Sequence, residues 1–317
     1  MVKLFLGNRA GVLALLPLLI FGYLMLNEQT GYYLYDSKNN LGIWGDVPSI
    51  NSQFARILAS IIVSFNAFAI NWIYNSNEFL ERNSYISALL YLVLMSFYHS
   101  FYSLDGLLLA HTFLIAMLYQ LFKLRQNEDG RRHIFNAAFF SGLAASFHPP
   151  MIVILPFFLF MVYTIRPFVF REMLLAIIGF GIPLLYGGLY LYYSGHIIDL
   201  KLINQSSDYF KKQNDFLIMS VLFTLLFVLS LITLRDKMQK SSSRLKKLIS
   251  ILWWMVLIGV LFGFMDFFVF GQIERFSFLM IPLSFFLSYS FKNKTFGGFA
   301  IVLYYLTFIY SLVNFFL

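Results

Sequence analysis

Two carboxylates in the first long polar stretch of the sequence are of a type that can do chemistry. Asp36 and Asp46 lie in the segment EQTGYYLYDSKNNLGIWGDVPS, between two apolar runs. A carboxylate within hydrogen-bond reach of a hydroxyl can take its proton while a group is transferred to the oxygen. We therefore consider Asp36 and Asp46 as candidates for catalysis. The alternative for both is an ordinary solvated acid in a polar loop.

Four cationic or cation-forming side chains are further candidates for ligand binding or acid–base catalysis. They are Arg56, His111, His148 and Arg275, all next to or inside apolar runs. For Arg56 and His111, the alternative is a structural hydrogen bond to a neighbouring helix. For Arg275, it is a local ion pair with Glu274, its neighbour in the sequence.

Other polar residues flank the same turns, namely His99, Asp105, Asp266 and Glu274. Ionisable groups within or beside membrane segments are costly and tend to be functional. The chain has no Cys, which excludes a disulfide framework and a thiolate metal site. It also lacks a phosphate-binding glycine loop, an HExxH motif and a GxSxG motif. The sequence predicts no metal site.

The composition places these residues in a membrane protein. The hydrophobic fraction is 60%, only 12% of residues are charged, and the mean hydropathy is +0.75. Soluble domains are about 45–50% apolar and about 25% charged. The formal charge of +8 is spread over short loops between apolar runs, so we attribute it to membrane orientation and exclude nucleic acid as a partner. We expect an all-α, polytopic transmembrane bundle.

Apolar runs predict about eleven membrane spans. A span needs roughly 17–25 mostly apolar residues to cross a hydrocarbon core of about 30 Å. The first run follows Lys3 and Arg9 and has no small-residue cleavage site after it, so we expect a retained helix rather than a signal peptide. The spans are predicted at 10–26, 53–74, 84–98, 106–122, 134–148, 151–165, 172–194, 216–234, 248–264, 276–290 and 297–316.

The distribution of charge predicts the orientation. With a cytoplasmic N-terminus and eleven spans, about 17 of the 23 Lys and Arg residues fall on the inner side, as the positive-inside rule requires. The six on the outer side are Lys38, Arg56, Lys201, Lys211, Lys212 and Arg275. The acids show the opposite bias, so the candidate site residues named above all face the outer side. We expect a multi-pass protein of a bacterial inner membrane.

The chain is predicted to form a single transmembrane domain, 1–317. Its longest outer loops are expected at 27–52 and 195–215, and its longest cytoplasmic loop at 235–247. Glycines and Pro183 interrupt the run 172–194, which indicates either a kink or close helix packing.

The stretch from Asp105 to Gly195 resembles the core of the GT-C superfamily of polytopic glycosyltransferases. The resemblance lies in LDGLLLAHTFLIAMLYQLFKLRQ, RRHIFNAAFFSGLAASFHPPMIVILPFFLFMVY and MLLAIIGFGIPLLYGGLYLYYSG. These show a helix that ends in a basic loop, a Gly-Leu-small helix, a polar-Pro turn and a Pro-containing span that ends in Tyr and Gly. The chain is also similar overall to uncharacterised bacterial membrane proteins of about this length.

The resemblance implies a transferase that uses a polyprenyl-phosphate-linked sugar, with or without a divalent cation. The matching first-loop acid, which acts in that superfamily as a base or metal partner, is Asp36, with Asp46 second. The phosphate-binding cations would be Arg56, His111, His148 or Arg275. This sequence lacks an acidic pair in the first loop and a large C-terminal domain, so a degenerate, non-catalytic relative is an alternative.

Three functions therefore remain open. The first is a GT-C-like transferase at the outer face of the inner membrane, acting on a lipid-linked substrate. The second is a non-catalytic integral membrane subunit of a larger complex with protein partners, consistent with the short chain. The third is a transporter for a lipid or small solute, for which the interrupted run 172–194 is the best sequence indication.

Overall fold

The structure, a computed structural model, describes residues 1–31, 41–45, 52–124, 129–194, 213–270, 273–293 and 295–316. Within them the chain is all-α. Its α-helices are α1 (Val2–Phe5), α2 (Leu15–Thr30), α3 (Ser52–Ser76), α4 (Ile86–Met95), α5 (Gly106–Phe122), α6 (Arg131–Phe147), α7 (Ile154–Ile165), α8 (Phe170–Ser194), α9 (Gln213–Lys240), α10 (Ser243–Phe270), α11 (Met280–Leu287) and α12 (Gly297–Val313). Short 3₁₀ helices join them: η1 (Ala10–Ala14), η2 (Gly42–Trp44), η3 (His99–Phe101), η4 (Pro149–Val153), η6 (Glu274–Leu279) and η7 (Ser290–Lys292).

The expected number of membrane spans, eleven, is wrong. Each predicted run contains helix, but in the described residues only six helices are long and apolar enough to cross a bilayer. The other helices have at most 17 residues. The shortest fall furthest short, because a helix rises only 1.5 Å per residue. The ten residues of α4 therefore extend about 15 Å and the eight of α11 about 12 Å. The six long helices are Ala10–Thr30, Gln53–Ser76, Gly106–Lys123, Phe170–Ser194, Leu217–Lys240 and Ser243–Val269.

The short helices α4 and α11 are enclosed by protein. Every residue of α4 is buried, and so is every residue of α11. A helix that is apolar all round is stable where other helices surround it. Here α4 packs against α3 and α11, and α11 also packs against α9 and α10. Their apolar sequences therefore reflect burial in the protein core rather than contact with lipid.

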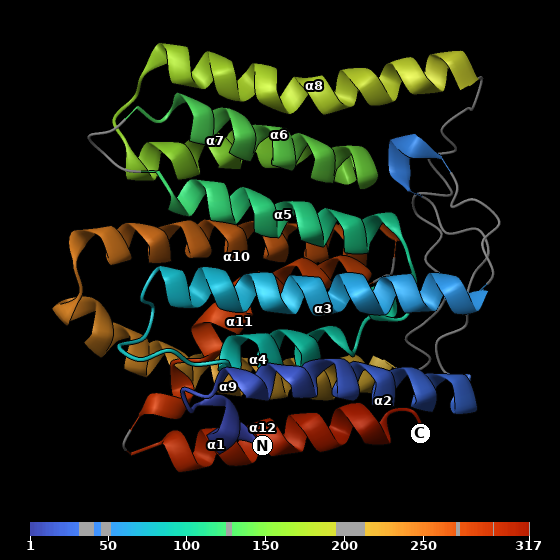
Figure 1. The fold of residues 1–317 in the computed structure, drawn as a ribbon, viewed down its shortest axis with the longest axis vertical. Helices are drawn as coiled ribbons and strands as arrows, with labels where there is room; N and C mark the ends of the chain where they lie inside the picture. Colours follow the sequence, from blue (N-terminus) through green and yellow to red (C-terminus); the bar gives the residue numbers. More distant parts are fainter. Residues whose placement is uncertain are drawn as a thin grey trace.

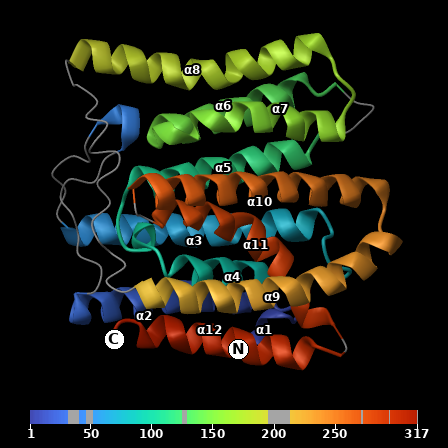
Figure 2. The ribbon, with the colours of Figure 1, turned by 180° about the vertical axis from the view of Figure 1, so that it is seen from behind.

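Successive helices run in opposite directions and form a bundle with two distinct ends (Figure 1). The turns after α3, α5, α7, α9 and α11 share one end, on the left of Figure 1. We call it the basic end because Arg82, Lys123, Arg166, Lys237 and Lys292 lie in or beside these turns. Seen from behind, α11 lies between α9 and α10, which form a long hairpin (Figure 2). The segment 235–247, expected to be a loop, is helical except for the turn between α9 and α10.

Close packing explains one glycine of the interrupted run in α8. A Cβ atom on Gly179 would lie 2.8 Å from the carbonyl oxygen of Phe135 in α6, whereas one on Gly181 would meet nothing within 4 Å. Small residues let helix backbones approach closely in membranes. At Gly179, therefore, close packing of α8 on α6 is the role of the glycine.

The outer surface of the bundle is apolar. On α8 alone, Leu185 is 69% exposed and Tyr192 and Tyr193 are more than 80% exposed. Large contiguous apolar surfaces are rare on soluble monomers and are expected where a protein faces lipid. By helix length and hydropathy the chain is a multi-pass membrane protein.

Candidate functional site

Seven of the ten predicted site residues lie together at the end of the bundle opposite the basic end. They come from η3, the start of α5, the end of α6, the last turns of α10 and the start of η6, and all are linked by contacts or electrostatic interactions. We call this group the ionisable cluster: His99, Asp105, His111, His148, Asp266, Glu274 and Arg275.

Arg275 is at the centre of the cluster. Its Nη1 lies 3.3 Å from Asp266 Oδ1, and its backbone N–H donates to Asp266 Oδ2 at 3.3 Å. Its Nε donates to His148 Nε2 at 3.1 Å, which places the proton of a neutral His148 on Nδ1. Arg275 and Asp266 are 4% and 1% exposed. Removing one partner of so buried a pair is strongly destabilising, because it leaves the other charge uncompensated.

Packing of η6 against α10 positions this arginine. Gly263 of α10 faces the ring of Phe276, and a side chain there would overlap the ring. The glycine lets the η6 backbone lie close to α10, one turn from Asp266. As a result, Arg275 and Asp266 meet although they belong to different elements.

His111 links the cluster to the bundle core. Its Nε2 lies 3.1 Å from Ser277 Oγ, and its Nδ1 lies 3.4 Å from the Tyr91 hydroxyl. The ring stacks on Phe278 with centroids 4.9 Å apart, and Phe278 also contacts His148. A structural hydrogen bond to a neighbouring element is the alternative role that the sequence analysis gave for His111.

Asp105 begins α5 as its N-cap. Its Oδ1 accepts from the Leu108 N–H at 2.7 Å, and its Oδ2 accepts from Ser100 Oγ at 2.7 Å. An acid in this position satisfies a helix N–H that would otherwise lack a partner. Burial raises the pKa of Asp105 to about 6, although its hydrogen bonds from Leu108 and Ser100 act in the opposite direction.

Glu274 is the second buried acid. Its Oε1 accepts from the His99 N–H at 3.3 Å, whereas its Oε2 has no hydrogen-bond partner in the described part of the chain. The pKa of Glu274 is raised to about 8, mainly by burial and to a smaller extent by the nearby Asp105 and Asp266, whereas the hydrogen bond from His99 acts in the opposite direction. At neutral pH most Glu274 side chains therefore carry a proton, and the carboxyl can donate it. His99 itself has Ser103 Oγ 2.8 Å from its Nδ1.

An apolar groove of about 250 Å³ runs beside the cluster. We call it the cluster-side groove; it lies between α9 and α10, over η6 and α11, and is lined by Tyr98, Ser220, Thr224, Phe276, Met280 and neighbouring apolar residues. Ser220 and Thr224 are on the exposed side, so the groove opens to the bundle surface. Tyr98 precedes His99, and its hydroxyl, which has no hydrogen-bond partner among the described residues, lies within electrostatic range of Glu274.

Three predicted site residues are not in the cluster. Arg56 lies in α3 and lines a separate groove of about 460 Å³ between α2 and α3, together with Glu28. Asp36 and Asp46 lie outside the described residues. The short helix η2 between them in the sequence is anchored next to His148, because Trp44 Nε1 donates to Ser146 Oγ at 3.0 Å. Gly42, with φ of 69°, lies against the Phe147 carbonyl and leaves no room for a Cβ.

Sequence reasoning missed the neutral partners of the cluster. Tyr91, Tyr98 and Ser277 lie in apolar stretches where they look like ordinary core or interface residues. The position of Tyr98 directly before His99 was the one available signal.

Within the described residues, no group of three or more His, Asp or Glu side chains is arranged to hold a metal ion. Comparisons of the chain with protein-family models, curated proteins and solved structures found no match.

Proposed function

We propose that the chain is a membrane-embedded transferase of the GT-C type, which takes a sugar from a polyprenyl-phosphate donor. The observation that carries the proposal is that the cluster-side groove is lined by Tyr98 and Phe276, which are the sequence neighbours of His99 and Arg275 in the ionisable cluster. A polyprenyl phosphate has a long apolar chain and an anionic head, so its site needs an apolar channel that ends at cations and proton-carrying groups. The groove and the cluster supply this combination at one end of the bundle.

Within this proposal the residues have distinct roles. Arg275 supplies positive charge to the phosphate, and Asp266 and His148 hold its guanidinium in place. Glu274 has a pKa of about 8 and can give or take a proton near neutral pH. Asp36 or Asp46 acts as the base toward the acceptor hydroxyl. The anchoring of Trp44, two residues before Asp46 in the sequence, beside His148 supports a site shared by the first polar loop and the cluster.

The test is loss of labelled sugar from a defined donor. Purified protein in liposomes would be given undecaprenyl phosphate carrying radiolabelled glucose or mannose, together with a cell-envelope extract that supplies acceptor hydroxyl groups. We expect transfer by the unaltered chain and a loss of 10²–10⁴-fold, the range for removing a general base, in Asp36→Asn or Asp46→Asn. The control is Asp208→Asn, which removes another acid from a predicted outer loop. Full activity in both Asp36→Asn and Asp46→Asn would refute the mechanism.

One observation favours a second candidate, the non-catalytic subunit. The described members of the cluster are largely buried and bonded to one another, as in a network that only stabilises a fold. This candidate predicts no transfer from any donor and co-purification with defined membrane partners in mild detergent. A transporter is less favoured, because Asp105, His148 and Glu274 lie at helix ends rather than near mid-membrane depth.

A further inference from the structure

A second groove lies at the basic end, on the surface of the α9–α10 hairpin. It has a volume of about 480 Å³, and we call it the basic-end groove. Its floor includes Leu234 and Ile249, which are buried, and one side is the partly exposed ring of Trp253. Arg235 and Lys246 line it too, one from each helix, and both are exposed. The groove thus combines an apolar floor with two cations.

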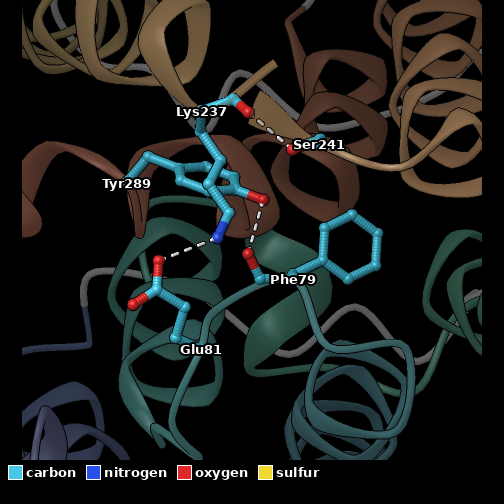
Figure 3. A network of polar contacts seen from close by, with 5 residues as sticks. All are labelled: Phe79, Glu81, Lys237, Ser241 and Tyr289. Carbon is cyan, nitrogen blue, oxygen red and sulfur yellow. Dashed lines mark hydrogen bonds and ion pairs between the residues drawn. The ribbon is translucent and has the colours of Figure 1, made fainter. Parts of the chain in front are cut away.

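Several other cations of the hairpin have partners. Lys237 forms an ion pair with Glu81 at 3.1 Å, beside the contact of the Tyr289 hydroxyl with the Phe79 carbonyl (Figure 3). Lys247 Nζ donates to the Ile165 carbonyl at 2.8 Å. In contrast, Arg235 and Lys246 form no ion pair with any acid in the described part of the chain. Their charge is available to a ligand.

The length of the hairpin places the two cations at headgroup depth. Each helix has 28 residues and so extends about 42 Å, more than the roughly 30 Å hydrocarbon core. Arg235 and Lys246 lie within six residues of the turn. We expect the excess length at this polar end, because charged side chains are costly inside the hydrocarbon core. Trp253 is seven residues beyond Lys246 along α10, about 10 Å deeper. Charge and apolar surface therefore follow each other along the groove in the order found in a phospholipid.

We propose that the basic-end groove binds one anionic phospholipid. Its phosphate lies between Arg235 and Lys246, and an acyl chain follows Leu234 and Ile249 toward Trp253. Basic pockets between membrane helices recognise anionic headgroups in this way. A zwitterionic lipid is disfavoured because its ammonium group would face the same two cations. The exposed carboxylate of Asp236, next to Arg235, does not line the groove. This inference does not depend on the proposed function.

The experiment is a lipid titration followed by native mass spectrometry on the full chain in mild detergent. Phosphatidylglycerol is compared with phosphatidylcholine of the same chains. A cation near the headgroup contributes on the order of 1 kcal/mol, so the double variant Arg235→Gln/Lys246→Gln is expected to bind phosphatidylglycerol about 30-fold more weakly. The control, Arg132→Gln/Lys240→Gln, removes the same charge from exposed basic-end positions outside the groove. Its affinity for phosphatidylglycerol is expected to be within about threefold of that of the unaltered chain.

Three results would overturn the inference. They are equal losses in the two double variants, equal affinity of the unaltered chain for both lipids, and displacement of bound phosphatidylglycerol by millimolar inorganic phosphate. The charge-preserving double variant Arg235→Lys/Lys246→Arg guards against a folding artefact. Its affinity for phosphatidylglycerol is expected to be within about threefold of that of the unaltered chain. Loss of binding in this variant would also count against the proposed site.

Discussion

At the scale of single residues, Glu274 is the side chain whose environment departs most from an ordinary surface acid. One carboxylate oxygen accepts from the His99 N–H, and the other has no partner in the described residues. Burial is the main reason that its pKa is raised to about 8 from 4.5, with Asp105 and Asp266 adding to the effect. The folded state therefore holds a proton that the unfolded chain releases near pH 4.5.

This proton predicts a pH dependence of stability. Between about pH 4.5 and pH 8 the folded state binds more protons at Glu274 than the unfolded state, so the free energy of unfolding falls as pH rises. The slope from one group is at most about 1.4 kcal/mol per pH unit. Asp105 adds a similar slope, but only up to about pH 6. The contribution of Glu274 is thus complete below about pH 4.5 and lost as pH rises through about 8.

Glu274→Gln is expected to flatten the stability curve between pH 6 and pH 8, because glutamine has no proton to lose there and still accepts from His99. Thermal unfolding in detergent at several pH values measures this. Glu78→Gln, at an exposed position, is the control, and its stability should depend on pH in the same way as that of the unaltered chain. Parallel curves for Glu274→Gln and the unaltered chain across this window would contradict the prediction.

The structure brings together seven of the ionisable residues that the sequence singled out, but the sequence did not indicate their neutral partners. Ionisable groups beside apolar runs are conspicuous, and His99, Asp105, His148 and Glu274 could be assigned to adjacent turns once the helices were placed. Tyr91 and Ser277 could not, because a hydroxyl in an apolar run looks the same whether it bonds to a histidine or to its own helix. Arg56 was included on charge and depth, but it faces the groove between α2 and α3.

At the scale of helices, the packing of α8 on α6 depends on which glycine faces the neighbour. Gly179→Ala is expected to lower the free energy of unfolding by about 1–3 kcal/mol, because the added methyl meets the Phe135 carbonyl and the backbones must separate. Gly181→Ala, two residues away on the same helix, meets open space and gains helix propensity, so stability should be unchanged or slightly higher. Thermal unfolding of the two variants side by side measures the difference, and equal stability would refute this account.

The predicted helix positions were largely right, and the predicted number of spans was not. Hydropathy shows that α4 and α11 avoid water, but it does not show whether lipid or protein surrounds them. The segment 235–247 was expected to be a loop because it is polar, yet a helix that projects beyond the hydrocarbon core is polar too. At 1.5 Å per residue, α4 and α11 are too short to span a bilayer. By the same measure, α9 and α10 are longer than the hydrocarbon core and so extend beyond it.

At the scale of the whole molecule, the division of charge between the two ends predicts the orientation. The positive-inside rule predicts that the basic end lies in the cytoplasm and the ionisable cluster on the outer side. Because the chain has no cysteine, a single introduced cysteine is the only thiol in the protein that a maleimide can label. In intact cells, a membrane-impermeant maleimide should label Asp208→Cys and leave Arg132→Cys unlabelled until the membrane is opened. The reverse pattern would contradict this orientation and place the cluster in the cytosol.

The enclosed helices α4 and α11 have a consequence for how the protein is made. A stretch of eight or ten residues cannot cross a bilayer alone, so neither helix can be held there as an independent inserted unit. They reach their places only by packing against longer helices that are already inserted. Since α4 rests on α11, which is synthesised nearly two hundred residues later, the interior stays incomplete until the C-terminal part of the chain leaves the ribosome. Maturation of the bundle is therefore a late event in its biogenesis.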